Sequence, residues 1–366
     1  MQSAILVTYP NSFFKNESNE LARAAGYQVI ETITQRFLLR SKFGIGAGKV
    51  EELRVLTEEN SPDAILFDEK LRPSQIYNLA KVMKTEIIDR ENVILQIFSR
   101  RANSAEAKLQ VQLAQLRYEI PRAREKVRMA RLGEQPGFLG LGGYEVDVYY
   151  NTIKKRISDI NAKLAQVRKR RNLYRENRAR LIIPTVSLSG YTGAGKTTLF
   201  NVLTGEDKDI DQGSFTTLLT SSRAIREFPR KVVLSDTVGF ISRLPAYMIE
   251  AFRSTLEEIT YSDLVILVLD VTGDSQDTLT RYQTCIQTLA DLRVPFSKTL
   301  ITLNKADLVE ETDIEDRARV LGLDRSSYIV ISAKSGLGLE ALKTKIVDLL
   351  GINQDSESAQ SIPVSR

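Results

Sequence analysis

One glycine-rich stretch constrains this chain more than any other feature of its sequence. Residues 190–197 read Gly-Tyr-Thr-Gly-Ala-Gly-Lys-Thr, which fits the pattern of a glycine, four residues, Gly-Lys and a hydroxyl. The apolar run at 186–188 predicts a strand, and residues 197–202 predict the start of a helix, the context that such a loop needs. Glycines let successive backbone N–H groups face one concavity, where the helix N-terminus adds its positive end. The stretch therefore predicts a phosphate-binding loop, against the alternative of a plain glycine-rich turn.

The chemistry of a phosphate-binding loop gives its residues separate tasks. Lys196 would reach the terminal phosphates of a bound di- or triphosphate, and the Thr197 hydroxyl would ligate Mg²⁺. We therefore expect nucleotide contacts from Gly190, Tyr191, Thr192, Gly193, Ala194, Gly195, Lys196, Thr197 and Thr198.

Length and composition bound what else the chain can do. Its 366 residues allow about two domains, and 42% apolar with 27% charged residues is ordinary for a globular protein. No apolar run approaches the ~20 residues of a membrane span, and residues 1–7 are too short and uncharged for a signal peptide, so we expect a cytoplasmic protein. A lone Cys285 excludes an internal disulfide, and the lack of histidine excludes a histidine-based acid or base and a histidine zinc site. Chemistry must come from carboxylates, lysines, the backbone and a bound metal.

Residues 1–103 alternate short β-rich runs with segments of helical periodicity. This alternation predicts a parallel sheet covered by helices, which would form an N-terminal α/β domain. The predicted strands are residues 4–7, 28–30, 64–67 and 86–88, and the predicted helices are residues 18–25, 49–57 and 73–83.

A second glycine-rich loop, within this first domain, suggests a second anion site. Gly44, Gly46 and Gly48 precede Lys49, and a glycine-rich loop before a helix can hold an anion. The hydroxyl that should follow the lysine is missing, because Val50 takes its place. We therefore favour a tight turn into the following helix over a second nucleotide site.

Residues 104–180 predict an antiparallel, coiled-coil-like pair of helices, because apolar residues repeat there at heptad spacing. Glycine-rich segments at 133–137 and 140–143 would break a helix and form the tip at which the pair folds back. Pro121 should kink or end the regular part of the first helix. The heptad positions are Leu109, Leu113, Leu116 and Ile120 in the first helix and Ile153, Ile157, Ile160, Leu164 and Val167 in the second.

The helical pair also concentrates the positive charge of the chain. It has 18 Lys and Arg against 8 Asp and Glu, a net charge of +10, whereas the whole chain carries +5. A charge run can be a plain solvated face, but two basic arms with Phe138 and Tyr144 at the tip favour polyanion binding. Neither helix has the broad apolar face of a membrane anchor, so we expect RNA as the partner, with no DNA and no membrane span. The basic runs are Arg122, Arg124, Lys126, Arg128 and Arg131, and Arg168, Lys169, Arg170 and Arg171.

A carboxylate motif follows the phosphate-binding loop. The apolar run at 232–235 predicts a strand that ends in Asp236, and the sequence continues to Gly239. Asp236 would hold Mg²⁺ through a water, and the Gly239 N–H would meet the γ-phosphate of a triphosphate.

A polar segment, Phe-Thr-Thr-Leu at 215–218, lies between the phosphate-binding loop and this motif and should be mobile. One of its threonines would complete the Mg²⁺ shell when γ-phosphate is present. We choose Thr217 over Thr216, which spacing alone does not separate, and we count Phe215 among the nucleotide contacts.

Two later motifs predict which base the nucleotide carries. The apolar run at 300–303 predicts a strand that delivers Asn304, Lys305 and Asp307. The Asp307 carboxylate can accept both ring N–H donors of guanine, and adenine offers no such pair, so guanine is expected. Lys305 would pack over the loop and the base. A strand at 328–331 then leads into a segment placed to meet the base carbonyl, which consists of Ser332, Ala333 and Lys334.

The fixed order of these motifs predicts one doubly wound sheet over residues 181–351, with every loop at its carboxyl edge. Each motif alone could be a turn at a strand end. The spacing is 40 residues from Lys196 to Asp236 and 68 from Asp236 to Asn304, and agreement of the whole set by chance is negligible. The residues expected to act in phosphate chemistry are Lys196, Thr217 and Gly239, and the metal ligands are Thr197, Thr217 and Asp236.

These motifs together resemble the HflX family of translation-associated GTPases over nearly the full length of the chain. The resemblance is carried by Gly-Tyr-Thr-x-Ala-Gly-Lys at 190–196, Phe-x-Thr-Leu at 215–218, Asp-Thr-Val-Gly-Phe-Ile at 236–241, the Ala-Phe-Arg-Ser-Thr-Leu-Glu-Glu run at 251–258, residues 106–111 with 116–118 in the helical pair, and residues 46–53 in the first domain.

The resemblance implies a GTP-hydrolysing switch protein that needs Mg²⁺ and binds GTP and GDP. It also implies binding to the large ribosomal subunit, with the N-terminal domain and the helical pair reaching toward rRNA, and in some members separation of stalled ribosomes. The threonine of the family's Phe-x-Thr-Leu box falls on Thr217. We expect a monomer.

The sequence departs from the family at three places. Gly193 stands where members commonly carry an asparagine that marks potassium-assisted GTPases, so potassium stimulation is not implied. Residues 137–147 lack the family's Glu-Thr-Gln-Leu-Glu sequence at the tip of the pair. Many members continue into a further C-terminal domain, whereas residues 352–366 of this chain are polar and predict a disordered tail.

The residue after Gly239 bears on the rate of hydrolysis. Many switch GTPases place there a glutamine that orients water, and this chain has Phe240, whose ring cannot hydrogen-bond the nucleophile. Intrinsic hydrolysis should therefore be slow, and the ribosome should supply the missing group. Two alternatives remain at this point: a signalling GTPase whose protein effector docks on the basic pair, and a metabolic kinase, which the base-selecting Asp307 disfavours.

Overall fold

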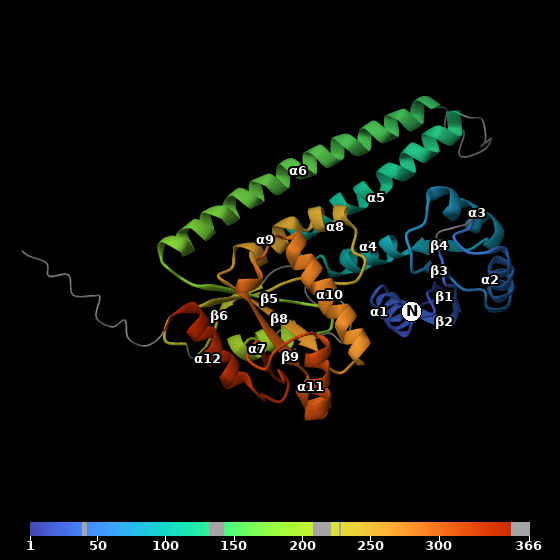
Figure 1. Ribbon diagram of the computed structural model, residues 1–366. Coiled ribbons are helices and arrows are strands. Elements are labelled where there is room, and N and C mark those ends of the chain that lie inside the picture. The colour runs from blue at the N-terminus through green and yellow to red at the C-terminus, as the bar shows by residue number, and fades with distance from the viewer. Residues whose placement is uncertain (39–41, 132–142, 208–220, 227, 353–366) are drawn as a thin grey trace, which may run out of the picture. The chain divides into compact units, whose positions relative to one another are not determined.

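The computed structural model describes residues 1–38, 42–131, 143–207, 221–226 and 228–352. The chain divides into two compact units (Figure 1). The first takes in Met1–Arg170 together with Pro245–Phe252, and the second takes in the remaining described residues from Arg171 onward. The helical pair is thus shared between the units, because the boundary at 170 falls within its second helix.

The first unit contains a four-stranded, entirely parallel sheet in the order β2-β1-β3-β4. The predicted N-terminal parallel α/β fold is therefore confirmed. Its apolar strands fill the core, with Ile5, Ile65 and Phe67 at most 1% exposed. The elements are β1 (Gln2–Thr8), α1 (Ser12–Ala24), β2 (Tyr27–Thr34), α2 (Ala47–Asn60), β3 (Ala64–Phe67), α3 (Pro73–Met83), β4 (Glu86–Asp89) and α4 (Arg90–Arg101).

Helices α1 and α4 differ most from the prediction, and helix α2 begins two residues earlier and ends three residues later than predicted. Helix α1 begins at Ser12 and not at residue 18, because Asn11 caps it by accepting a hydrogen bond from the Phe14 backbone N–H. Helix α4 was not predicted at all. Asp89 caps its N-terminus, and its apolar residues Val93, Ile94, Ile97 and Phe98 are buried.

The predicted helical pair is confirmed as α5 (Ala105–Arg131) and α6 (Gly143–Arg180), which run in opposite directions (Figure 1). The Tyr149 hydroxyl donates to Glu119 at 3.3 Å across the pair. Helix α5 continues past Pro121, although the proline removes one backbone hydrogen bond there. Pro121 itself is exposed, and the buried side chains of Tyr118 and Ala123 hold the helix on either side of it. The predicted tip at 133–143 falls largely outside the described residues.

The second unit contains a six-stranded sheet in the order β10-β9-β8-β5-β7-β6. Five strands are parallel, as predicted for a doubly wound sheet, and the edge strand β6 is antiparallel. The strands are β5 (Thr185–Gly190), β6 (Ser221–Ala224), β7 (Val233–Asp236), β8 (Leu264–Asp270), β9 (Thr299–Asn304) and β10 (Tyr328–Val330). The helices are α7 (Lys196–Thr204), α9 (Arg253–Tyr261), α10 (Ser275–Asp291), α11 (Glu311–Val320) and α12 (Leu339–Leu350).

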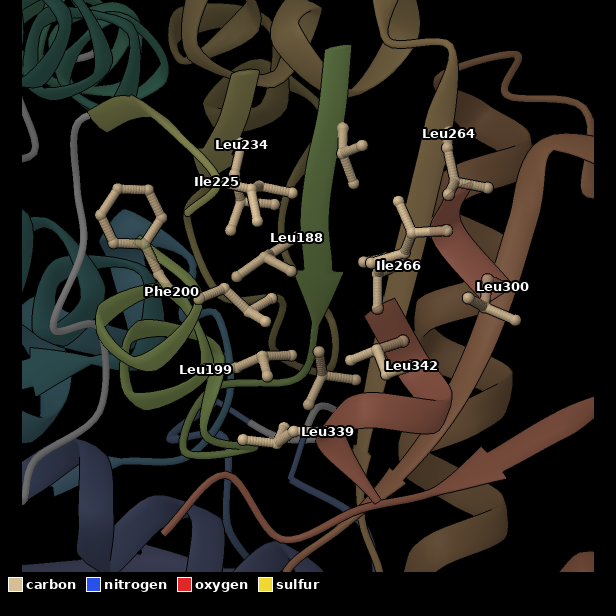
Figure 2. Packing of buried hydrophobic residues seen from close by; sticks show 14 of the residues in the cluster. Leu188, Leu199, Phe200, Ile225, Leu234, Leu264, Ile266, Leu300, Leu339 and Leu342 are labelled. Atoms are coloured by element: carbon tan, nitrogen blue, oxygen red, sulfur yellow. The ribbon is translucent and has the colours of Figure 1, made fainter. Parts of the chain in front are cut away.

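The core of the second unit lies between this sheet and helices α7 and α12. Figure 2 shows Leu199 and Phe200 of α7 and Leu339 and Leu342 of α12 packed toward the strands. Each fully buried side chain of this size contributes about 1.5–3 kcal/mol to folding. Ile352, the first residue of the predicted tail, is also buried in this cluster, and the remainder of the tail lies outside the described residues. This packing holds in place β5 and α7, the two elements that flank the glycine-rich loop at the carboxyl edge of the sheet.

Helix α8 (Ala246–Ala251) belongs to the first unit, although it follows the Asp236 motif in sequence. The ring of Phe252 meets Phe98 edge-on at 4.6 Å, and the Tyr247 hydroxyl donates to Glu91 at 2.9 Å.

Among the described residues, no helix combines the length and the apolar composition needed to cross a membrane.

Candidate nucleotide site

The candidate site lies at the carboxyl edge of the second unit's sheet, where β5 ends at Gly190 and α7 begins at Lys196. Gly195, between them, has a φ of +94°, and a Cβ there would lie 2.3 Å from the Asn304 Nδ2. Only glycine fits that position, because side chains rarely adopt this φ and the neighbouring amide leaves no room. The loop therefore curls as the sequence predicts, with Gly193 exposed at its crest.

Lys196 is buried in the loop and points back along it. Its Nζ donates to the carbonyl oxygens of Gly190 at 3.0 Å and Tyr191 at 2.8 Å. Burial lowers the pKa of Lys196 to about 8, and the nearby Asp236 carboxylate opposes that shift. A phosphate group bound beside this ammonium would raise the pKa of Lys196 again and favour its charged form.

Thr197 and Asp236 come together from different elements. Thr197 is at the start of α7 and Asp236 is the last residue of β7, and the Thr197 hydroxyl donates to the Asp236 Oδ2 at 3.1 Å. Both side chains are buried. A hydroxyl and a carboxylate are the oxygen ligands that Mg²⁺ takes, with water and phosphate filling its other positions, so this pair fits the metal.

The segment after Asp236 is bonded directly to the phosphate-binding loop. The Phe240 backbone N–H donates to the Gly190 carbonyl at 3.0 Å, and the Thr192 N–H donates to the Phe240 carbonyl at 2.8 Å. The Ser242 N–H donates to the Tyr191 hydroxyl at 2.9 Å. Hydrogen bonds therefore hold residues 240–242 against residues 190–192 of the phosphate-binding loop, whose carbonyl oxygens accept from Lys196.

Gly239 lies within this contact. A Cβ at Gly239 would approach the Thr192 Cα to 2.9 Å and the Lys196 Nζ to 3.1 Å. The backbone of residue 239 therefore approaches the loop as closely as a glycine allows, which suits the predicted contact of its N–H with a terminal phosphate. Phe215 and Thr217 fall outside the described residues, so their predicted roles stay predictions.

Asn304 joins the phosphate-binding loop to the last predicted motif. Its Nδ2 donates to the Ala194 carbonyl at 2.8 Å, and its Oδ1 accepts from the Ala333 N–H at 2.9 Å. The side chain is 2% exposed, so both bonds are shielded from water. One buried amide thus sets the spacing between the loop for the phosphates and the loop for the base.

The other predicted base-side residues follow Asn304 in the chain or belong to the segment 332–334, whose Ala333 N–H bonds to its side chain. Asp307 lies exposed in the short 3-10 helix Ala306–Leu308, and Lys305 adopts a φ of +67° just before it. Ser332 is buried, and Lys334 is exposed. Thr198 is half-buried on the first turn of α7.

The sequence prediction missed Asp270 and Ser242. Asp270 ends β8 beside Asn304, and its Oδ2 lies 2.7 Å from the Lys305 Nζ. A signal for it exists, because Asp270 ends an apolar run in the same way as Asp236 does. Ser242 takes part through its backbone, and a backbone contact leaves no trace in residue type.

The glycine-rich loop of the first unit has a structural role. Gln35 accepts a hydrogen bond from the Gly46 N–H at 3.0 Å, and helix α2 begins at the next residue. Lys49 pairs with Glu52 at 2.6 Å on the exposed surface of that helix. These contacts agree with the turn that we favoured over a second nucleotide site.

The basic residues of the helical pair divide into two groups. Arg122 is 18% exposed in its side chain and pairs with the buried Asp89 at 2.9 Å, and Arg175 pairs with Glu258 at 2.9 Å. These cations stabilise the units in which they lie. Lys169 and Arg170 are exposed on α6 and are available to a partner.

Three family models match the chain. They are described as GTP-binding GTPase N-terminal over residues 15–99, GTP-binding GTPase Middle Region over residues 101–178, and 50S ribosome-binding GTPase over residues 185–305. The matches follow one another in the order of the predicted first domain, helical pair and nucleotide domain.

Curated relatives match over most of their length. The protein named GTPase HflX of Methanocaldococcus jannaschii is 42% identical over 342 residues, which cover 92% of this chain and 83% of that protein. The protein of the same name from Thermococcus kodakarensis is 40% identical over 327 residues, covering 87% of this chain and 74% of that protein.

A solved structure extends the similarity to the fold. A GTP-binding protein from the hyperthermophilic archaeon Sulfolobus solfataricus, in complex with GDP, is 28% identical and has a TM-score of 0.51. The match covers 96% of this chain and 99% of that chain. A second structure, described as SsGBP and GDP complex, has a TM-score of 0.56 at the same identity and coverage.

Proposed function

Because the chain belongs to the HflX family of GTPases, we propose that it binds GTP with Mg²⁺, hydrolyses it to GDP and phosphate, and associates with the large ribosomal subunit through rRNA. Its task there would be the rescue, splitting or recycling of ribosomes. The family relationship supplies the reaction class, and the contacts within the second unit support the assignment of individual residues.

The observation that carries the nucleotide part is the buried Asn304 amide, bonded to Ala194 on one side and to Ala333 on the other. It holds the two halves of a nucleotide site at a fixed separation. On the base side, the Asp307 carboxylate would accept the two ring donors of guanine, and an adenine there would leave that acceptor unpaired. On the phosphate side, Lys196 would bind the β- and γ-phosphates.

The metal part of the proposal uses Thr197 and Asp236, whose oxygens lie 3.1 Å apart. Mg²⁺ bound there would neutralise charge on the phosphates. Thr197 would ligate the ion directly, and Asp236 would hold it through a water. Thr217 would complete the shell in the triphosphate state.

Slow intrinsic hydrolysis follows from the residue after Gly239. The Phe240 ring is buried at 2% exposure and offers no hydrogen bond to a water. Its backbone is bonded to Gly190, so that an outside group or a rearrangement of this segment is needed to orient the nucleophile. The large ribosomal subunit would supply that group.

The ribosome part of the proposal is supported by exposed cations on α6, among them Lys169 and Arg170. Binding through phosphates releases counterions, so affinity for the subunit should fall steeply with salt. Lys169→Glu should weaken binding and reduce the logarithmic salt slope by about one or more, because a phosphate contact is lost. Lys298→Glu is the matched control, since Lys298 is also exposed but lies away from the helical pair in sequence.

Co-sedimentation with purified large subunits tests the proposal. The protein should pellet with the subunit in a non-hydrolysable GTP analogue more than in GDP, and GTP turnover should rise when subunits are added. Sucrose gradients of whole ribosomes then distinguish splitting from simple association. A signalling GTPase with a protein effector would instead keep its partner after RNase treatment and show no stimulation by subunits.

A further inference from the structure

Asp270 lies at the edge of the sheet that carries the candidate site. It is the last residue of β8, and in the parallel ladder with β9 it is paired with Asn304. The carboxyl ends of neighbouring parallel strands meet at one edge, so the side chain of Asp270 starts beside the segment expected to hold the base. Asp270 is not one of the residues proposed to contact the nucleotide.

The Asp270 carboxylate is held from two sides. Its Oδ1 accepts hydrogen bonds from the Thr272 N–H at 2.9 Å and the Thr272 hydroxyl at 2.7 Å. Its Oδ2 lies 2.7 Å from the Lys305 Nζ, and a nitrogen of Arg281 lies 3.6 Å from the same oxygen. The carboxylate side chain is 10% exposed, so the pair is partly shielded from water.

The charge on Asp270 is stable at neutral pH. Burial pushes the pKa of its carboxyl upward, but Lys305 and Thr272 together outweigh that effect and hold the pKa below its ordinary value. The carboxylate is therefore ionised wherever the protein is folded at neutral pH, and it can attract the lysine throughout that range.

The Lys305 backbone is fixed, whereas its long side chain depends on a partner. The residue has a φ of +67°, a conformation that side chains rarely adopt. It persists because the Asn304 side chain is bonded on both sides and the Ala306 N–H donates to the Ile331 carbonyl at 3.2 Å. Four rotatable bonds then separate this backbone from the ammonium, and the bond to Asp270 orders them.

We propose that Asp270 is a positioning residue for guanine nucleotide binding: by pairing with the Lys305 ammonium, it holds the lysine stem extended so that the stem covers the face of the bound base. The inference rests on the proposed function, since it takes the guanine site as given. Asp270 itself does not touch the nucleotide. A lysine ordered before the base arrives costs less on binding than one that the base must order.

A double-mutant cycle on the full-length protein tests this inference. The affinity and dissociation rate of a fluorescent GDP analogue are measured for wild type, Asp270→Asn, Lys305→Ala and the double variant. Asp270→Asn should weaken binding about tenfold, mainly by faster dissociation, as expected for loss of one partly shielded charged contact. The double variant should bind no more weakly than Lys305→Ala alone, because Asp270 acts only through the lysine.

Asp274→Asn is the matched control. Asp274 lies four residues along the same loop, is exposed, and caps α10 through a bond from the Asp277 N–H that asparagine can also accept. This variant removes an equal charge and should bind GDP as wild type does. A tenfold loss in the control would mean that net charge, and not the lysine contact, sets affinity, and would overturn the inference.

Two further results would also overturn it: wild-type affinity in Asp270→Asn, or losses that add in the double variant. If Asp270→Asn does not fold, Thr272→Val provides the second test, because it removes one hydrogen bond from the same carboxylate and should weaken GDP binding severalfold only when Lys305 is present. A wild-type protein that prefers ADP would defeat the proposed function itself, and that result is read from the wild type alone.

Discussion

At the scale of single residues, the candidate site depends on buried polar groups whose hydrogen bonds are made within the protein. Asn304 is the central example, since one amide both donates to the phosphate-binding loop and accepts from the base loop. Burial makes such a group costly to leave unpaired, so its partners fix the geometry of both loops.

Asn304→Ala should therefore weaken GDP binding strongly and lower the free energy of unfolding by about 1–3 kcal/mol, because the Ala194 carbonyl and the Ala333 N–H lose a buried partner. Urea denaturation and nucleotide titration measure the two effects. Asn161→Ala, at an exposed position of α6, is the control and should change neither. Unchanged nucleotide affinity in Asn304→Ala would contradict the bridging role.

Cys285 should report on the integrity of the nucleotide domain. The thiol is fully buried, and burial raises its pKa to about 12 from an ordinary value of 9.0. The native thiol therefore stays protonated at pH 8 and should not react with a thiol reagent, whereas the unfolded chain reacts readily.

The same shift predicts a pH dependence. As the pH rises toward and past 9, the unfolded chain ionises the Cys285 thiol and the folded chain does not, so this group's contribution to stability falls. For the labelling prediction, mass spectrometry after treatment with the thiol reagent, with and without denaturant, measures the reactivity of the Cys285 thiol. Rapid labelling of the native protein at pH 8 would count against the burial of this side chain.

Residue identity alone selected most of the candidate site, because its chemistry requires particular residue types at fixed spacing, and the roles of these residues stay predictions. Asn304, Lys305 and Asp307 were recognised for that reason. Asp270 was not, although it ends an apolar run as Asp236 does, since its contact with Lys305 depends on which strand lies next to β9.

At the scale of elements, the segment after Asp236 is bonded to the phosphate-binding loop by a parallel bridge between Tyr191 and Phe240 and by the Tyr191 hydroxyl. We expect this segment to rearrange when a γ-phosphate binds near Lys196, because the backbone of Gly239 leaves little space there. A Cβ added to Gly239 would lie only 3.1 Å from the lysine Nζ.

Tyr191→Phe should loosen the segment without removing the ring. The Ser242 N–H loses its acceptor, and a loss of about 1.4 kcal/mol would raise local opening about tenfold. Hydrogen exchange at residues 239–242 measures the opening. Tyr282→Phe, at a half-buried position of α10, is the control, and equal exchange in Tyr191→Phe and wild type would argue against the bond.

Helix α12 should carry much of the stability of the second unit. Leu342 is fully buried against the sheet (Figure 2), and Leu342→Ala should lower the free energy of unfolding by about 2–5 kcal/mol. Leu349→Ala on the same helix is the control, because Leu349 is 50% exposed. Urea denaturation followed by circular dichroism compares them, and equal losses would mean that the helix does not pack as described.

Element type was predictable where local patterns were strong. The helix at 73–83 and the strand at 64–67 have the predicted bounds, since a proline begins one and an apolar run forms the other. The edge strand β6 was missed, because its polar sequence Ser-Ser-Arg-Ala has no strand pattern and it is a strand only by pairing with β7.

At the scale of the whole molecule, charge and nucleotide chemistry are separated along the chain. Residues 104–180 carry a net charge of +10 in a chain of +5, and the candidate nucleotide site lies in the second unit. The charge distribution could be read from composition alone. The division into two units could not, because it depends on contacts such as that of Phe252 with Phe98, far apart in sequence.

The central claim is that a guanine nucleotide, recognised through hydrogen bonds to the Asp307 carboxylate, controls association with the large ribosomal subunit. The most direct test is subunit co-sedimentation of Asp307→Asn, in which the new amide should reject guanine and accept xanthine. Wild type should bind the subunit with a GTP analogue and not with its xanthine counterpart, and Asp307→Asn should show the reverse preference. Binding of Asp307→Asn with the GTP analogue at wild-type strength, and none gained with the xanthine analogue, would contradict the account.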